Sequence, residues 1–266
     1  MSSPASPPVA TRSSGQRLAI AALAVVQILV TLLPSAGIGA PIGERSDNVR
    51  TLITPAGWAF SIWGPLYAGS LAYAVYQLLP GQRDNGLLAR IGWASAGAFL
   101  GNAAWALYVQ FVAVDAVSAA IIAFTLACLL SIYRALAEAR AFSRGERFLV
   151  ALPLSALAAW LTAATIVNIA AALVHHGVDA GESAPLVAAA IVLVGGAIAA
   201  AAIWRGRGNP WYALVFLWAL AGIHAAEAGR REVDAATLAA GVLVLAVTLA
   251  RLAGPANRRH WLGGPA

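Results

Sequence analysis

Long apolar runs, separated by short polar segments, dominate the chain. A membrane-spanning helix needs about 20 mostly apolar residues, because the hydrocarbon core is about 30 Å thick and an α-helix rises about 1.5 Å per residue. The pattern recurs eight times, which predicts an all-α fold, a polytopic bundle of about eight transmembrane helices. The predicted spans are 18–38, 55–79, 88–111, 114–137, 147–174, 184–204, 211–226 and 234–252.

Turn-forming residues interrupt the runs. Pro80-Gly81 and Asn209-Pro210 are typical of turns between helices. The predicted span 211–226 is the shortest, and Pro210 suits the first turn of a helix. The pattern therefore predicts short connections between antiparallel neighbours, with 211–226 as the span with the weakest support.

Both ends of the chain are polar. Residues 1–17 contain prolines, serines and two arginines without an apolar face, so we expect a disordered basic tail. Residues 254–266 are expected to form a C-terminal tail. The run 18–38 is long for the core of a signal peptide and has a poor cleavage site, so an uncleaved first helix is the better interpretation.

The arginines are distributed unevenly. All 17 basic residues are arginines, and with eight spans and an inner N-terminus, 13 of them fall on the inner side and 4 on the outer side. This positive-inside bias predicts that both termini are cytoplasmic, in the cell membrane or bacterial inner membrane. Of the 266 residues, 61% are apolar and 11% are charged, which indicates a lipid bilayer as the surroundings. The net charge of +6 therefore orients helices, and no nucleic-acid partner is expected.

The longest predicted loop, residues 39–54, falls outside. It mixes charged residues with several glycines. A loop of this length either covers a site or merely connects two helices, and the sequence leaves both interpretations open.

Aromatic residues gather in the second span. Trp58, Phe60, Trp63 and Tyr67 exceed what an interfacial belt requires, and Trp63 and Tyr67 lie one helical turn apart. Pro65 is expected to break the backbone ladder there. The pattern is compatible with aromatic packing around a kink, or with the wall of a pocket for a flat ligand.

Two amide side chains accompany further tryptophans. Asn102 and Trp105 share a face of the third span, and Trp160 and Asn168 lie close to one face of the fifth. A buried amide in lipid needs a partner, so both asparagines are expected to face the bundle interior. They either link helices or provide polar anchors in a mainly apolar pocket.

The ionisable residues give weaker indications of function than the aromatic and amide residues. Asp115 is explained as a helix cap, while His224 and Glu227, three apart, are compatible with a proton relay or metal site, or with wet surface groups. The single cysteine, Cys128, is expected to pack inertly. No phosphate loop, zinc motif or nucleophile elbow occurs, so we predict no enzyme, no catalytic residue, no metal site and no resident cofactor.

Taken together, these motifs resemble the TspO/MBR family, the tryptophan-rich sensory proteins related to the translocator protein. The order Pro-x-Gly-Trp-x-Phe, then Trp and Tyr, is followed by Asn-x-x-Trp, by Asp, and by Trp with Asn eight residues later. The matching residues are Pro55, Gly57, Trp58, Phe60, Trp63, Tyr67, Asn102, Trp105, Asp115, Trp160 and Asn168. The resemblance covers residues 18–174, the five helices of the family, so 184–253 forms an additional three-helix segment.

The resemblance implies a pocket under the first loop for tetrapyrroles, sterols or other hydrophobic ligands, and it implies a homodimer. It assigns the ligand-binding roles to Trp58, Phe60, Trp63, Tyr67, Asn102, Trp105, Trp160 and Asn168. The leading hypothesis is a membrane protein that binds a flat hydrophobic ligand in a sensory or transport-linked role. A proton-coupled secondary transporter is the alternative, and a tetrapyrrole enzyme is the third class considered.

Overall fold

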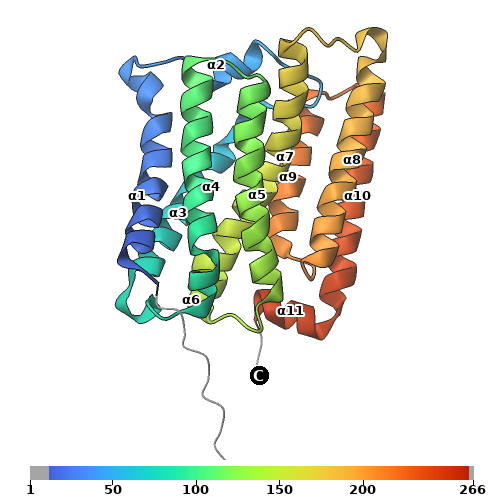
Figure 1. Cartoon of the computed structure of the whole chain (residues 1–266). Helices are drawn as coiled ribbons and strands as arrows, with labels where there is room; N and C mark the ends of the chain where they lie inside the picture. The colour runs from blue at the N-terminus through green and yellow to red at the C-terminus, as the bar shows by residue number, and fades with distance from the viewer. Residues whose placement is uncertain (1–11, 264–266) are drawn as a thin grey trace, which may run out of the picture.

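The computed structural model describes residues 12–263 and shows an antiparallel helical bundle without strands in that range (Figure 1). All eight predicted spans form helices that run between the same two ends of the bundle. These helices are α1 (Ser14–Thr31), α3 (Trp63–Leu78), α4 (Gly86–Phe111), α5 (Ala116–Glu138), α7 (Leu152–His175), α8 (Ala184–Arg205), α9 (Pro210–Ala226) and α10 (Arg231–Ala253). The predicted all-α, polytopic fold is confirmed.

Five helical segments within the described chain are long and apolar enough to cross a membrane by themselves. They contain α1, α5, α7, α8 and α10. The helix α9 is apolar but has 17 residues, and α3 has 16 because its predicted span begins with a 3-10 helix, η2 (Gly57–Ile62). The helix α4 has 26 residues, but its buried face carries Ser95, Asn102 and Gln110, which make it less apolar.

The first helix begins earlier than the predicted span. Residues 1–11 lie outside the described part, but α1 starts at Ser14, after a cap in which Ser13 Oγ accepts from the N–H of Gln16. Arg12 and Arg17 are buried because their guanidinium groups donate to the backbone oxygen of Gln77, in the last turn of α3. Carbonyls at a helix C-terminus lack partners within the helix, so they attract these cations. The prediction of a disordered tail is therefore wrong for residues 12–17.

A short helix also replaces the start of the predicted C-terminal tail. The helix α11 (Pro255–Leu262) lies across the end of the bundle where α1 begins (Figure 1). Trp261 is fully buried and its indole N–H donates to the backbone oxygen of Gly206 at 3.0 Å. Up to residue 263, the C-terminal segment is packed structure, because one large aromatic side chain fixes it to the turn after α8.

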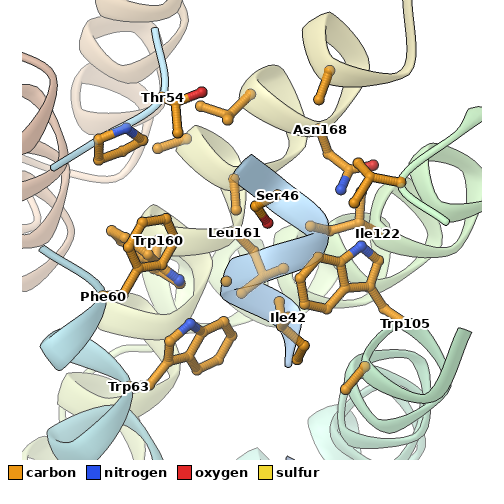
Figure 2. A pocket seen from close by; sticks show the side chains of 18 of the residues that line it. Ile42, Ser46, Thr54, Phe60, Trp63, Trp105, Ile122, Trp160, Leu161 and Asn168 are labelled. Carbon is orange, nitrogen blue, oxygen red and sulfur yellow. The ribbon is translucent and has the colours of Figure 1, made fainter. Parts of the chain in front are cut away.

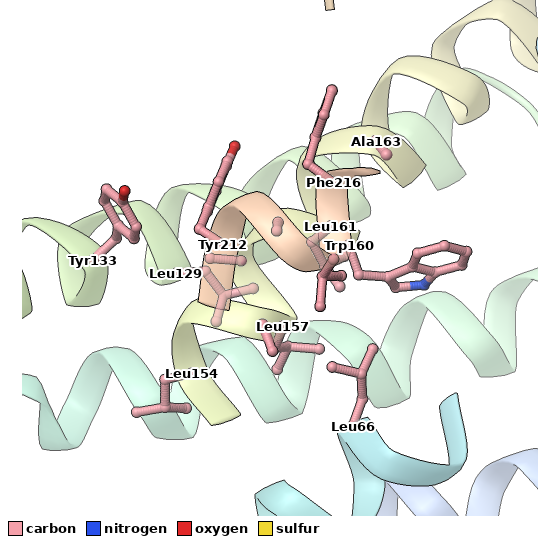
Figure 3. Close-up of a cluster of buried hydrophobic side chains, with 14 of the residues drawn as sticks. Leu66, Leu129, Tyr133, Leu154, Leu157, Trp160, Leu161, Ala163, Tyr212 and Phe216 are labelled. Atoms are coloured by element: carbon pink, nitrogen blue, oxygen red, sulfur yellow. The ribbon is translucent and has the colours of Figure 1, made fainter. Parts of the chain in front are cut away.

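The helices form one packed bundle. The helices α8 and α10 pack most extensively on each other, and α9 packs on α7 and α10. Figure 3 shows Tyr212 and Phe216 of α9 beside Leu157 and Trp160 of α7, and the Tyr212 hydroxyl donates to Thr162 Oγ1 at 2.9 Å. A single hydrophobic core thus extends through the five-helix region, 18–174, and the additional three-helix segment, 184–253.

Candidate ligand-binding pocket

A cavity of about 460 Å³ lies inside the bundle beneath the loop that follows α1. Side chains from η2, α3, α4, α5 and α7 form its walls, and α2 (Ile42–Asp47) crosses its open end (Figure 2). Its volume falls within the usual range for small-molecule sites, about 300–1,000 Å³. Seven of the eight predicted site residues line it, namely Phe60, Trp63, Tyr67, Asn102, Trp105, Trp160 and Asn168.

One wall of the cavity is aromatic. The Trp63 ring stacks on Tyr67 with centroids 5.1 Å apart and planes 25° apart. Phe60 and Trp63 each meet Trp160 edge to face, at centroid distances of 5.9 and 6.2 Å. Residues three apart are aligned in a 3-10 helix and residues four apart share a face of an α-helix, so the change of helix type at Trp63 aligns Phe60, Trp63 and Tyr67.

Trp58 does not belong to this wall. Its side chain is 48% exposed and packs edge to face on Trp218 of α9, with centroids 4.9 Å apart. In a 3-10 helix the side chains of residues two positions apart point in directions that differ by about 240°. Trp58 and Phe60 therefore point to different sides. The structure thus places Trp58 outside the lining of this cavity, whereas the sequence had grouped it with the other ligand-site residues.

The sequence had suggested that Pro65 breaks the hydrogen-bond ladder in the middle of a helix. The structure shows no such break. The helix α3 begins at Trp63, which places Pro65 in its first turn. The first N–H groups of a helix have no partner within it, so a proline there removes no intrahelical hydrogen bond. The irregular element is η2, which precedes the proline.

Both predicted amides link helices and border the cavity. Asn102 Nδ2 donates to Gln27 Oε1 of α1 at 3.0 Å, and Asn168 Oδ1 accepts from Ser118 Oγ of α5 at 2.9 Å. The two interpretations offered by the sequence are thus compatible with each other. Sequence reasoning missed Gln27, although a glutamine within an apolar span is the signal that would have identified it.

Two indole N–H groups in the cavity walls have no protein partner. They belong to Trp105 and Trp160, and both nitrogen atoms are buried. Buried donors are normally hydrogen-bonded, and an indole can only donate. The remaining lining is mainly apolar, from residues such as Ile122, Leu161 and Val167. The walls are therefore mainly flat and apolar, and they contain two buried indole donors that the protein itself leaves without a partner.

The predicted outer loop, residues 39–54, covers one end of the cavity. Ile42, Gly43 and Ser46 of α2 line the cavity. The loop is fixed to the end of α4, because the backbone N–H of Ala40 donates to the backbone oxygen of Gln110 at 3.0 Å. These contacts match the interpretation of residues 39–54 as the cover of a site.

The ionisable residues singled out earlier lie apart from the cavity. Asp115 caps α5 as predicted, accepting from the backbone N–H groups of Val117 and Ser118. His224 and Glu227 do not form a pair. His224 Nδ1 lies 3.2 Å from Asp234 Oδ1 of α10, whereas Glu227 pairs with Arg230 at 2.7 Å. No group of three or more His, Cys, Asp or Glu side chains within 12–263 could hold a metal ion.

The fold and its cavity define a polytopic helical membrane protein with an internal, aromatic-walled pocket of ligand size. The family model described as TSPO-like protein matches residues 16–252, and the chain belongs to this family. The match includes α8, α9 and most of α10, which the motif resemblance had left outside. Searches of curated proteins and of solved structures found no match.

Proposed function

We propose that the protein binds a flat hydrophobic ligand, such as a tetrapyrrole or a sterol, in the cavity beneath α2. The observation that carries the proposal is the arrangement of Trp63, Trp105 and Trp160 around about 460 Å³ of space. Aromatic faces stabilise planar apolar molecules by burial and stacking. The indole N–H groups of Trp105 and Trp160 have no partner in the protein and are buried, so a small rotation of either ring would be needed before it could donate to the polar edge of such a ligand.

We further propose a sensory or transport-linked role in the cell membrane, with both termini cytoplasmic. The supporting observations are the 13 arginines assigned to one side against 4 on the other, and the position of α1's first turn and α11 at the same end of the bundle (Figure 1). The homodimer implied by the resemblance stays a prediction.

The alternative, a proton-coupled transporter, was based on the eight spans, on Pro65 within a helix and on ionisable residues including Asp115. Its candidate proton-relay residues are His224 and Glu227. Each of these side chains is paired with a different residue, and neither lines the cavity. Ligand binding is therefore the better supported of the two functions.

Binding can be tested with the purified protein in lipid nanodiscs. Protoporphyrin IX is titrated in, and the shift of its main absorption band is followed, which does not depend on tryptophan emission. Trp160→Leu and Trp105→Leu should each weaken binding about tenfold, the equivalent of roughly 1.4 kcal/mol of aromatic contact. Trp93→Leu is the matched control, because Trp93 is 65% exposed on the outside of α4.

A sterol, titrated as a competitor, distinguishes a general hydrophobic pocket from one selective for tetrapyrroles. Saturable binding that the two cavity variants weaken and Trp93→Leu leaves unchanged would support the proposal. Porphyrin uptake no greater than that of empty nanodiscs would refute it.

A further inference from the structure

The helix α9 packs against the segment that forms one wall of the cavity. Two hydrogen bonds join them. The indole N–H of Trp218 donates to the backbone oxygen of Ala59 at 2.9 Å, and the backbone N–H of Ala56 donates to the backbone oxygen of Gly222 at 2.9 Å. The segment 56–59 is therefore bonded at both of its ends to α9, a helix of the C-terminal segment.

Gly222 allows this close approach. A β-carbon added at Gly222 would lie 2.7 Å from Ala59 Cβ and 3.0 Å from Pro55 Cβ. Carbon atoms essentially never come this close, so an alanine at this position would displace either α9 or the segment 55–59, which includes the start of η2. Because Gly222 has no side chain, Pro55 and Ala59 can pack directly against the backbone of α9.

The opposite face of the same short segment belongs to the cavity. Gly57 and Phe60 line it, Ala56 and Ala59 contact α9, and Pro55 borders both the cavity and α9. A 3-10 helix has poorer hydrogen-bond geometry than an α-helix and needs support from its surroundings. Any displacement of the segment by α9 would change the position of Phe60, which meets Trp160 edge to face.

The helix α9 is itself held by two neighbours. At its start, Asn209 Nδ2 donates to Ser155 Oγ of α7 at 2.8 Å, and Tyr212 donates to Thr162 of the same helix. At its end, His224 pairs with Asp234 of α10. The position of α9, and with it the position of the wall, is thus set by both parts of the chain.

We propose that the C-terminal helices determine the shape of the ligand cavity. Trp218 and Gly222 are positioning residues for η2, the 3-10 helix that forms part of the cavity wall. The inference rests on the proposed function only for the identity of the ligand. It assigns a role to α9, and through α9 to the paired helices α8 and α10.

A cysteine introduced in place of Gly57 reports the position of the cavity wall in the absence of any ligand. A β-carbon at Gly57 meets no atom within 4 Å, and the native Cys128 is removed as Cys128→Ser. The labelling rate of Gly57→Cys with a maleimide is then measured in nanodiscs. Trp218→Phe keeps a ring but removes the indole donor, so the segment should shift and the labelling rate of this exposed cysteine should change about fivefold. Protoporphyrin binding should weaken by a similar factor.

Gly222→Ala provides an independent variant. It should change the labelling rate by more than about threefold and weaken porphyrin binding, because the added methyl group displaces the wall. Ala59→Gly removes the nearest opposing carbon, so the double variant Ala59→Gly/Gly222→Ala should recover most of both values. A general loss of packing would not be rescued by removing the methyl group of Ala59.

Two matched controls come from α9 and from its neighbour α10. Trp211→Phe lies on α9, but the indole N–H of Trp211 has no partner to lose. Gly241→Ala lies on α10, where a β-carbon would come no closer than 3.8 Å to its nearest neighbour, Leu217. Both variants should leave labelling and binding unchanged. Thermal unfolding in detergent establishes that every variant folds.

Unchanged labelling in both Trp218→Phe and Gly222→Ala would overturn the inference. Equal effects in Trp211→Phe and Trp218→Phe would also overturn it, because the hydrogen bond would then be irrelevant. If the parent protein binds no porphyrin, the proposed function fails, while the labelling rates still decide the role of α9.

Discussion

Asn102 of α4 donates a hydrogen bond to Gln27 of α1 over 3.0 Å, and both side chains are almost completely buried. Asn102 also borders the ligand cavity, so one amide joins two helices and contributes to the pocket. Hydrogen bonds between transmembrane helices are worth about 0.6 kcal/mol on average and up to about 1.7 kcal/mol.

Replacing Asn102 by leucine should lower the free energy of unfolding by about 1–2 kcal/mol, because Gln27 is left without a partner. Unfolding in mixed detergent micelles measures the change. The double variant Gln27→Leu/Asn102→Leu should be more stable than Asn102→Leu alone, since no unpaired amide remains. Equal stability of the single and double variants would contradict the pairing.

The close contact between α4 and α5 depends on Gly101. A β-carbon there would lie 2.3 Å from Thr125 Oγ1. Gly101→Ala should therefore destabilise the protein by about 1–3 kcal/mol, the usual cost of overpacking. Thermal unfolding measures the shift. Gly64→Ala, which meets no atom within 4 Å, is the control and should be neutral within about 1 kcal/mol.

His260 of α11 should make stability dependent on pH. Burial, together with the neighbouring charge of Arg207, lowers the pKa of His260 from 6.5 to about 4. The folded state therefore favours the neutral ring, and its stabilising effect is complete above pH of about 6.5. As the pH falls from that value towards 4, the unfolded chain binds a proton that the folded chain excludes, so stability decreases.

The measurement is the unfolding temperature at pH 7 and at pH 5 for the parent protein and for His260→Phe. The variant should lose less stability between the two values, since it lacks the titrating ring. A pH dependence identical in both proteins would show that His260 makes no contribution.

Trp58 and Trp63 should differ in their effect on ligand binding. Trp63→Leu removes a ring of the cavity wall and should weaken protoporphyrin binding about tenfold. Trp58→Leu removes a ring that lies against Trp218 outside the cavity, so its effect should be no more than about threefold. Absorption titrations of the two variants test this order, and a larger loss in Trp58→Leu would reverse the assignment.

The spans and most of the cavity could be predicted from the sequence for a physical reason. Lipid requires long apolar segments, and within them Asn102 and Asn168 stand out because a buried amide needs a partner. The aromatic cluster at Phe60 and Trp63 was also recognisable. Its helix type was not, and the 3-10 geometry of η2 is what directs Trp58 away from the cavity.

The contacts that sequence reasoning missed join residues far apart in the chain. Trp218 and Ala59 are separated by 159 positions, and both lie in segments whose local pattern is only that of an apolar helix. His224 was expected beside Glu227, three residues away, but α10 brings Asp234 closer. Such pairings depend on how helices are arranged, which local periodicity does not specify.

The hydrogen bond between Trp218 and Ala59 joins two parts of one polypeptide. A wall supported by a second protein molecule would form only above a certain concentration, according to mass action. Here the supporting helix is tethered to the wall it supports, which gives it a high effective concentration however few copies a cell contains. Each chain therefore contains the whole cavity, and for the proposed ligand we expect the number of sites to follow the number of chains rather than their state of assembly.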